Sequence, residues 1–191
     1  SVASSLMEPV TFYKELRRKR DDAHKFMRFV TNQIMKFGKA QLKAGADVIA
    51  ISDPSGTGEI LGPKFFEEFA VRYINLLIDG IREVNKDIPI IVHICGQMHS
   101  VYSELKNLKA DVFSFDAVVN IKELKEHIEG KILMGNISSL ALATATEDKI
   151  KTMTQNAING GIDILSPACG LGTQSSMKNI QVMLKTVKGE Y

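Results

Sequence analysis

The sequence predicts an α/β fold built on a parallel sheet. Short apolar segments rich in Ile and Val alternate along the chain with longer segments of helical periodicity. The apolar segments have few polar positions, which is typical of strands covered on both faces. Alternation of this kind indicates parallel strands joined by right-handed helical crossovers. No linker or low-complexity tract divides the chain, so residues 1–191 are expected to form a single domain.

Five segments are predicted to be strands. In chain order they are ADVIAISDP (46–54), PIIVHIC (89–95), ADVFSFDA (110–117), KILMGNIS (131–138) and GIDILSPAC (161–169). A closed (β/α)8 barrel needs eight strands and about 250 residues. The residues therefore leave two arrangements open, a doubly wound open sheet and part of a barrel.

Helical patterns fill the intervals between these strands. After an N-terminal stub, Asp21 or Asp22 is expected to cap a helix that ends near Ala44. Pro63 suits the first position of a second long helix over 62–85. Shorter helices are expected over 98–108, 121–128, 146–160 and 174–187.

Composition and charge exclude several classes of function. The net charge of +2 gives no electrostatic signature of nucleic-acid binding. No apolar run approaches the roughly 20 residues of a membrane-spanning helix, and no signal-peptide pattern is visible at the start. The two cysteines exclude a disulfide scaffold and favour a reducing compartment. A cytoplasmic protein without nucleic-acid or membrane partners is expected.

The clearest candidate for chemistry is the end of the second predicted strand, where His93 and Cys95 are two residues apart. Residues i and i+2 of a strand point to the same side, so both side chains project together. Gly96 ends the strand, which places the pair at the carboxyl end, where α/β folds carry their active sites. Taken alone, the pair favours a core histidine beside an inert cysteine.

The second cysteine favours a metal site instead. Cys169 also lies at the carboxyl end of a predicted strand and is also followed by glycine. Imidazole nitrogen and thiolate sulfur are preferred zinc ligands, and a catalytic zinc site uses three protein ligands with one open position. We therefore predict that His93, Cys95 and Cys169 form one site.

Three further polar residues follow predicted strands, namely Asp53, Asp116 and Asn136. Each is a candidate catalytic residue because of that position. Each also has a structural interpretation, for example Asp53 as the first residue of a turn before Pro54.

The motifs HICG (93–96) and PACG (167–170) together resemble the zinc motif of the methylcobalamin:coenzyme M methyltransferases. That family belongs to the uroporphyrinogen decarboxylase superfamily. AGADVIAISDPSGTGEILGPKFFEEF (44–69), MGNIS (134–138) and KNI (178–180) resemble other elements of it. The resemblance covers the whole chain but only the later portion of the family's (β/α)8 barrels. The implied fold is the C-terminal five βα units of such a barrel, truncated at its N-terminus.

The resemblance implies zinc bound by His93, Cys95 and Cys169, with Asp53, Asp116 and Asn136 supporting the ligands or the substrate. The implied reaction moves a methyl group from a methylated corrinoid, carried on a partner protein, to a small thiol such as coenzyme M. Two alternatives stay open. One is a lyase that resembles uroporphyrinogen decarboxylase, and the other is a catalytically incomplete barrel fragment. An open barrel exposes strand edges, so self-association or association with the missing barrel portion is expected.

Overall fold

A computed structural model describes residues 1–190, which contain one parallel sheet with the strand order β1-β2-β3-β4-β5. All four pairs of neighbouring strands are parallel. Each of the five predicted strand segments contains one observed strand, so these predictions are confirmed. The strands are β1 (Ile49–Ser52), β2 (Ile90–Ile94), β3 (Val112–Phe115), β4 (Ile132–Ile137) and β5 (Ile164–Pro167).

The strand order decides between the two arrangements that the sequence left open. Each strand pairs with the next one along the chain, so every crossover advances in the same direction across the sheet. A doubly wound sheet reverses direction at a switch point, whereas a (β/α)8 barrel does not. The fold is therefore an arc of five βα units from a barrel.

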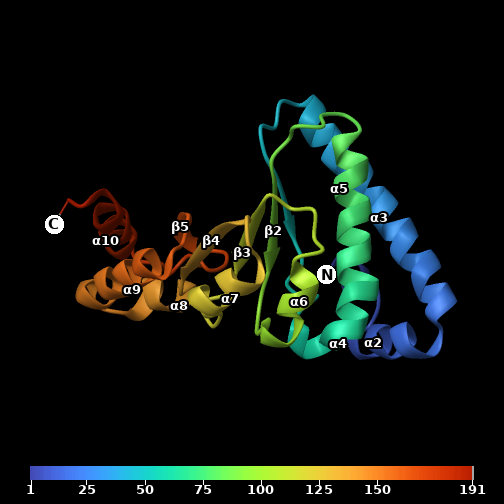
Figure 1. Ribbon diagram of the computed structural model, residues 1–191, viewed down its shortest axis with the longest axis horizontal. Helices are drawn as coiled ribbons and strands as arrows, with labels where there is room; N and C mark the ends of the chain where they lie inside the picture. Colours follow the sequence, from blue (N-terminus) through green and yellow to red (C-terminus); the bar gives the residue numbers. More distant parts are fainter. Residues whose placement is uncertain (191) are drawn as a thin grey trace.

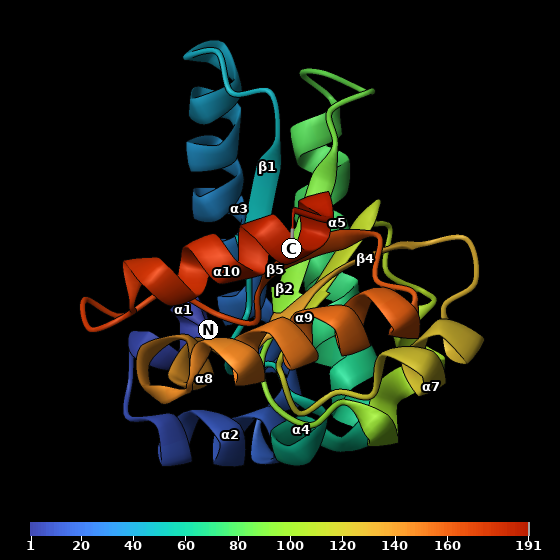
Figure 2. The ribbon, with the colours of Figure 1, turned by 90° about the vertical axis from the view of Figure 1, so that its left-hand side faces the viewer.

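Most of the longer helices lie in two groups, one near each end of the arc, with α6 and α7 between them. Figure 1 shows α3 and α5 side by side near β1 and β2, and α8, α9 and α10 gathered beside β4 and β5. Figure 2 shows α10 passing in front of β5. In residues 1–190, no helix has the length and apolar content needed to span a membrane. The helices are α1 (Val2–Ser5), α2 (Pro9–Arg18), α3 (Arg20–Lys43), α4 (Gly58–Phe65), the π-helical η1 (Phe66–Val71), α5 (Arg72–Arg82), the 3₁₀ helix η2 (His99–Val101), α6 (Tyr102–Leu105), α7 (Ile121–His127), α8 (Ser139–Thr144), α9 (Glu147–Gly160) and α10 (Met177–Lys188).

The N-terminal stub that precedes the βα units contains two helices that the sequence did not predict, α1 and α2. Glu8 caps α2 by accepting hydrogen bonds from the N–H groups of Val10 and Thr11, and Pro9 occupies the first helical position. The expected caps of α3 are wrong. The helix begins at Arg20, so Asp21 and Asp22 lie in its first turn, where their negative charges interact favourably with the helix dipole.

The two faces of the sheet differ in burial. In β2, Ile90, Val92 and Ile94 are buried beneath the helices, whereas the alternate residues Ile91 and His93 are half-buried. The prediction that strands are covered on both faces holds for β3, all of whose residues are buried, but it is wrong elsewhere. In a closed barrel, side chains from strands on the opposite side cover the inner face of each strand. The five described strands form only an arc, so the inner face of most strands stays partly exposed.

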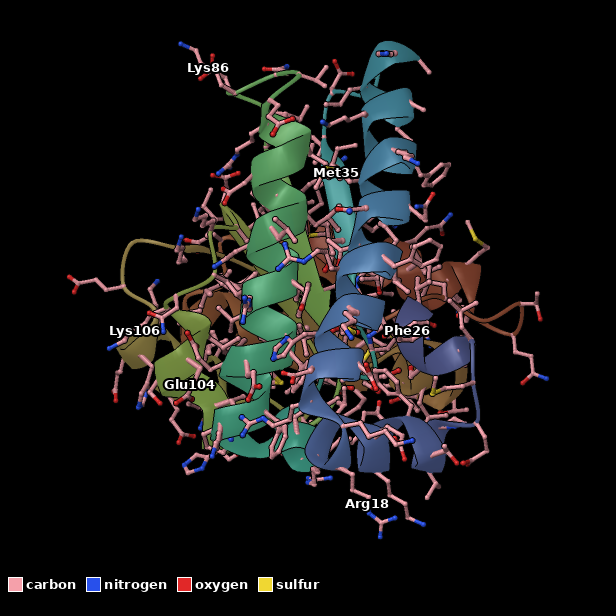
Figure 3. All side chains as sticks on the ribbon, turned by 90° about the vertical axis from the view of Figure 1, so that its right-hand side faces the viewer. Arg18, Phe26, Met35, Lys86, Glu104 and Lys106 are labelled. Carbon is pink, nitrogen blue, oxygen red and sulfur yellow. The ribbon has the colours of Figure 1, made fainter. Side chains whose placement is uncertain are left out.

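The helices α3 and α5 pack closely because α5 carries a glycine at the contact. Met35 of α3 lies against Gly80 of α5, where an added Cβ would come within 2.2 Å of the Met35 side chain (Figure 3). The same helices contribute Val30, Ile74 and Leu77 to the apolar core that extends under the sheet. This contact holds together the helices that precede β1 and β2.

Candidate metal centre

The structure brings His93, Cys95 and Cys169 together at the carboxyl ends of β2 and β5. The Nε2 atom of His93 lies 3.1 Å from the Sγ atom of Cys95, and the two Sγ atoms are 3.9 Å apart. The potential ligand atoms of all three residues lie within 4.8 Å of one another. His93 and Cys95 are half-buried and Cys169 is exposed, so the group is open on one side.

Curvature of the sheet creates this proximity. Two strands, β3 and β4, separate β2 from β5 in the sheet. In a flat sheet, three strand spacings would place β2 and β5 about 14 Å apart. A sulfur–sulfur distance of 3.9 Å therefore requires the strand ends to converge, as they do in a barrel.

The donor group fits a zinc ion. Tetrahedral zinc with ordinary bond lengths would separate two sulfur ligands by about 3.8 Å, and a nitrogen from a sulfur by about 3.6 Å. The observed distances of 3.9 and 3.1 Å lie within about 0.5 Å of these values, and the widest separation in the group, at most 4.8 Å, would close by about 1 Å on binding. Three protein ligands would leave a fourth position for an external ligand on the open side.

Two serines hold the ligands in place. The hydroxyl of Ser114 on β3 lies 2.9 Å from Nδ1 of His93, and Ser114 is only 9% exposed. This contact turns the other ring nitrogen, Nε2, toward Cys95. At the start of α8, the Ser139 hydroxyl donates to the carbonyl oxygen of Cys169 at 3.0 Å. Both sides of the group are thus tied to neighbouring elements.

The protonation states of the ligands follow from their surroundings. Burial lowers the pKa of His93, and attraction to Asp116 only partly opposes this effect. Burial, followed by the neighbouring Cys169 and the negative charges of Asp116 and Asp53, raises the pKa of Cys95 to about 11. At neutral pH His93 is therefore a neutral ligand, while Cys95 keeps its proton unless a cation displaces it.

Two of the three predicted catalytic residues lie beside this group. Asp116 accepts a hydrogen bond from the Gly96 N–H at 3.1 Å, so its carboxylate supports the turn that carries Cys95. The backbone N–H of Asp53 donates to the carbonyl of His93 at 2.8 Å, and the carboxylate of Asp53 accepts from the Ser1 hydroxyl. The negative charges of these two carboxylates raise the pKa of the Cys95 thiol.

Asn136 has a different environment. Its side-chain amide donates to the backbone carbonyls of Asp116 at 3.2 Å and Val119 at 3.0 Å. These contacts tie β4 to the loop after β3. Asn136 also lines a cavity with Met153 and Ala157 of α9, on the helix side of the sheet. Its described contacts therefore support the loop of Asp116 and do not reach the three ligands themselves.

A cavity of about 280 Å³ adjoins the donor group on the inner face of the arc. Three of its lining residues are serines that sequence reasoning missed, because a serine within an apolar strand carries no distinctive pattern. Of the three serines, only Ser114 could have been found from the sequence, because it lies two residues before Asp116 and therefore on the same side of the strand. The lining residues are Ser52, His93, Ser114, Met134, Ser166, Pro167, Ala168, Cys169 and Gly170.

The fold and the site together define a class, a parallel (β/α) barrel arc with a histidine and two cysteines at the carboxyl ends of its strands. The uroporphyrinogen decarboxylase (URO-D) family model matches residues 1–190, and the chain belongs to this family. The expected membership of the uroporphyrinogen decarboxylase superfamily is thereby confirmed.

Relatives of this chain include proteins named methylcobamide:CoM methyltransferases and proteins named uroporphyrinogen decarboxylases. The methylcobamide:CoM methyltransferase MtaA of Methanosarcina barkeri is 29% identical, with 100% of this chain and 56% of the relative covered. MtbA of Methanosarcina acetivorans, a methylcobamide:CoM methyltransferase, is 29% identical over 84% of this chain and 47% of its own length. The uroporphyrinogen decarboxylase of Thermodesulfovibrio yellowstonii is 30% identical over 67% of this chain and 36% of its own length.

A solved structure supports the assignment of the fold. A methyltransferase from Methanosarcina mazei superposes with a TM-score of 0.90 at 28% identity. The match covers 100% of this chain and 56% of that structure. The chain thus spans about half the length of the proteins that it matches.

Proposed function

We propose that this chain carries the thiol-activating half of a corrinoid-dependent methyltransferase that methylates a small thiol such as coenzyme M. The observation that supports this most directly is the group of His93, Cys95 and Cys169, whose donor atoms lie within 4.8 Å of one another. The names of the methylcobamide:CoM methyltransferases among its relatives agree with this proposal.

The donor set suits alkylation of a thiol. When bound, zinc would act as a Lewis acid that keeps an acceptor thiol in its thiolate form at neutral pH. The neutral imidazole of His93 and the thiolates of Cys95 and Cys169 together cancel the charge of Zn²⁺. An added substrate thiolate leaves the site at −1, so too little positive charge remains to quench its nucleophilicity. Asp53 and Asp116 add negative charge nearby, which favours the same outcome.

The chain's own residues would then place the acceptor sulfur. Ser114 orients the His93 ring, and the turn after β2 presents Cys95 toward Cys169. The open side of the group, where Cys169 is exposed, leaves room for the acceptor and for a methylated corrinoid on a partner protein. The acceptor thiolate would form a sulfur–carbon bond with the methyl group while the cobalt–carbon bond of the corrinoid donor breaks, and the bonding electron pair would stay on the donor's cobalt.

Zinc binding gives the first test. The wild-type chain is expected to bind about one zinc per chain, and His93→Ala, Cys95→Ser and Cys169→Ser are each expected to lose it. His127→Ala is the matched control, because His127 is exposed on α7. Stoichiometric zinc in the cysteine variants would contradict the proposed ligand set.

The second test follows methyl transfer from free methylcobalamin to coenzyme M, with the zinc-loaded wild-type chain and the Cys169→Ser variant. We expect S-methylation by the wild type alone. The named alternative, a decarboxylase-like lyase, would use His93 or Cys95 in acid–base work and would keep its turnover after the removal of zinc. The incomplete-fragment alternative would fold and associate without transferring methyl groups.

We also propose that the open face of the arc associates with a second copy or with the rest of a barrel. The strands β1 and β5 each have one sheet neighbour in the described chain, and Ile132 and Ile164 remain 42% and 41% exposed. Uncovered edges and apolar side chains of this kind favour pairing. Elution as a monomer across a range of protein concentrations would contradict self-association.

A further inference from the structure

The turn after β2 carries Cys95 but belongs to no regular element. The strand ends at Ile94, and Gly96 has a φ of +77°, a left-handed conformation that suits glycine. The backbone N–H groups of Gly96 and Gln97 thus point out of the sheet and need acceptors elsewhere. The way in which these groups are satisfied decides how firmly Cys95 is held.

Two carboxylates from opposite sides supply these acceptors. The N–H of Gly96 donates to Oδ2 of Asp116 at 3.1 Å, and the N–H of Gln97 donates to Oε1 of Glu59 at 2.7 Å. Asp116 follows β3, whereas Glu59 lies in the first turn of α4, which follows β1. Because β1 and β3 are the two neighbours of β2, the turn is held from both flanking strands.

Close packing brings Glu59 within reach of the turn. A Cβ added to Gly58 would lie 3.0 Å from the carbonyl oxygen of Gln97 and 2.9 Å from Oγ of Ser100. A Cβ added to Gly96 would lie 3.3 Å from Cγ2 of Thr57 and 3.6 Å from Oε1 of Glu59. The start of α4 therefore packs closely against Gly96 and Gln97 of the turn, although Glu59 itself is exposed.

We propose that Glu59 is a positioning residue for the metal centre, and that its carboxylate holds the Cys95–Gly96–Gln97 turn against Asp116. The 2.7 Å distance between the Gln97 nitrogen and Oε1 of Glu59 lies at the short end of the range for N–H···O hydrogen bonds. The bond fixes the peptide that follows Gly96, and hence the distance between the sulfurs of Cys95 and Cys169. This inference rests on the proposed function, since it assigns Glu59 to the same site.

The proposed role of Glu59 depends on the length of its side chain rather than on its charge, and two conservative variants separate these two properties. Glu59→Asp keeps the charge but shortens the side chain by one methylene, so the carboxylate no longer reaches Gln97. Glu59→Gln loses the charge but keeps an oxygen acceptor at the same distance. Glu126→Ala, at an exposed position on α7, is the matched control.

The first measurement is the affinity for Zn²⁺, determined by competition with a chromophoric chelator. Loss of such a supporting contact costs about 10- to 100-fold in metal affinity, and we expect Glu59→Asp to lie near the lower bound. Glu59→Gln is expected to stay within about threefold of the wild type because the amide oxygen still accepts. Equal affinities for Glu59→Asp and the wild type, or equal losses in both variants, would overturn the proposal.

A second measurement needs no metal. In the metal-free chain, dibromobimane bridges two thiols that lie close together, as Cys95 and Cys169 do at 3.9 Å. We expect Glu59→Asp to slow this bridging and Glu59→Gln to leave it near the wild-type rate, with melting temperatures unchanged. Equal rates in all variants would refute the positioning role. If the wild type bound no zinc, the proposed function would fail, and the bridging rates would still decide the role of Glu59.

Discussion

Removal of the Ser114 hydroxyl is expected to weaken zinc binding more than it weakens the fold. The Ser114→Ala variant removes the side-chain hydrogen bond to Nδ1 of His93, which measures 2.9 Å at a position that is 9% exposed. Loss of one ordinary hydrogen bond costs about 0.5–1.5 kcal/mol of unfolding free energy. Loss of the contact that orients a metal-binding histidine costs about 10- to 100-fold in affinity, or about 1.4–2.7 kcal/mol.

The assay compares both quantities in the same preparations. Chelator competition gives the affinity for Zn²⁺, and urea unfolding of the metal-free chain gives the stability. Ser103→Ala, at an exposed position on α6, is the control and should change neither. The reasoning would be refuted if Ser114→Ala bound zinc within about twofold of the wild type, because a supporting hydrogen bond of this kind should cost at least tenfold.

Three other outcomes are expected. In urea unfolding, Gly96→Ala should lower the unfolding free energy by about 1–2 kcal/mol, because the φ angle of Gly96 is +77°. Gly170→Ala is the control and should change it little, because no atom lies within 4 Å of the added Cβ. The apparent zinc affinity should rise at least about tenfold per pH unit between about pH 6 and 8, since Cys95, with a pKa raised to about 11, must release its proton; a pH-independent titration would contradict this. The hydrogen bond from Arg20 lowers the pKa of Glu68, so the ionised Glu68 side chain stabilises the fold above about pH 4.3 and this stabilisation is lost as the pH falls further. The difference in unfolding free energy between the wild type and Glu68→Gln should therefore shrink between about pH 6 and 3.5. A constant difference would argue against an ion pair between Arg20 and Glu68.

The strands were predictable because each is a local feature. An apolar run of four to six residues bounded by glycine, proline or charge predicts a strand wherever it stands in the fold. The helices near the N-terminus were missed for a related reason. The segment around α2 carries many charges and only two buried residues, Phe12 and Leu16, so its apolar content is low even though its apolar residues share one face. Its cap at Glu8 lies outside the Ser, Thr, Asp and Asn residues that usually signal a helix start.

The sequence indicated His93, Cys95 and Cys169 through their places at strand ends, whereas it gave no sign of Glu59, which reaches the turn of Cys95 from the first turn of α4. His93 and Cys95 share a side of β2 by the two-residue period of a strand, which any sequence displays. Glu59 lies 36 residues before Cys95 in the chain and reaches its turn only because α4 packs beneath it. Asn136 was expected at the site because it lies near a strand end, and the structure describes its amide in contact with the backbone of the loop after β3.

By itself, the sequence determined the alternation of strands and helices, the parallel sheet and the pairing of His93 with Cys95 on one side of a strand. These depend on periodicities of two and 3.6 residues, which short segments carry. Only the tertiary structure decided that the sheet is a barrel arc and that Cys169, 74 residues beyond Cys95, lies 3.9 Å from it. That distance depends on the curvature of the intervening strands, which arises from packing across the whole sheet and is encoded in no single segment.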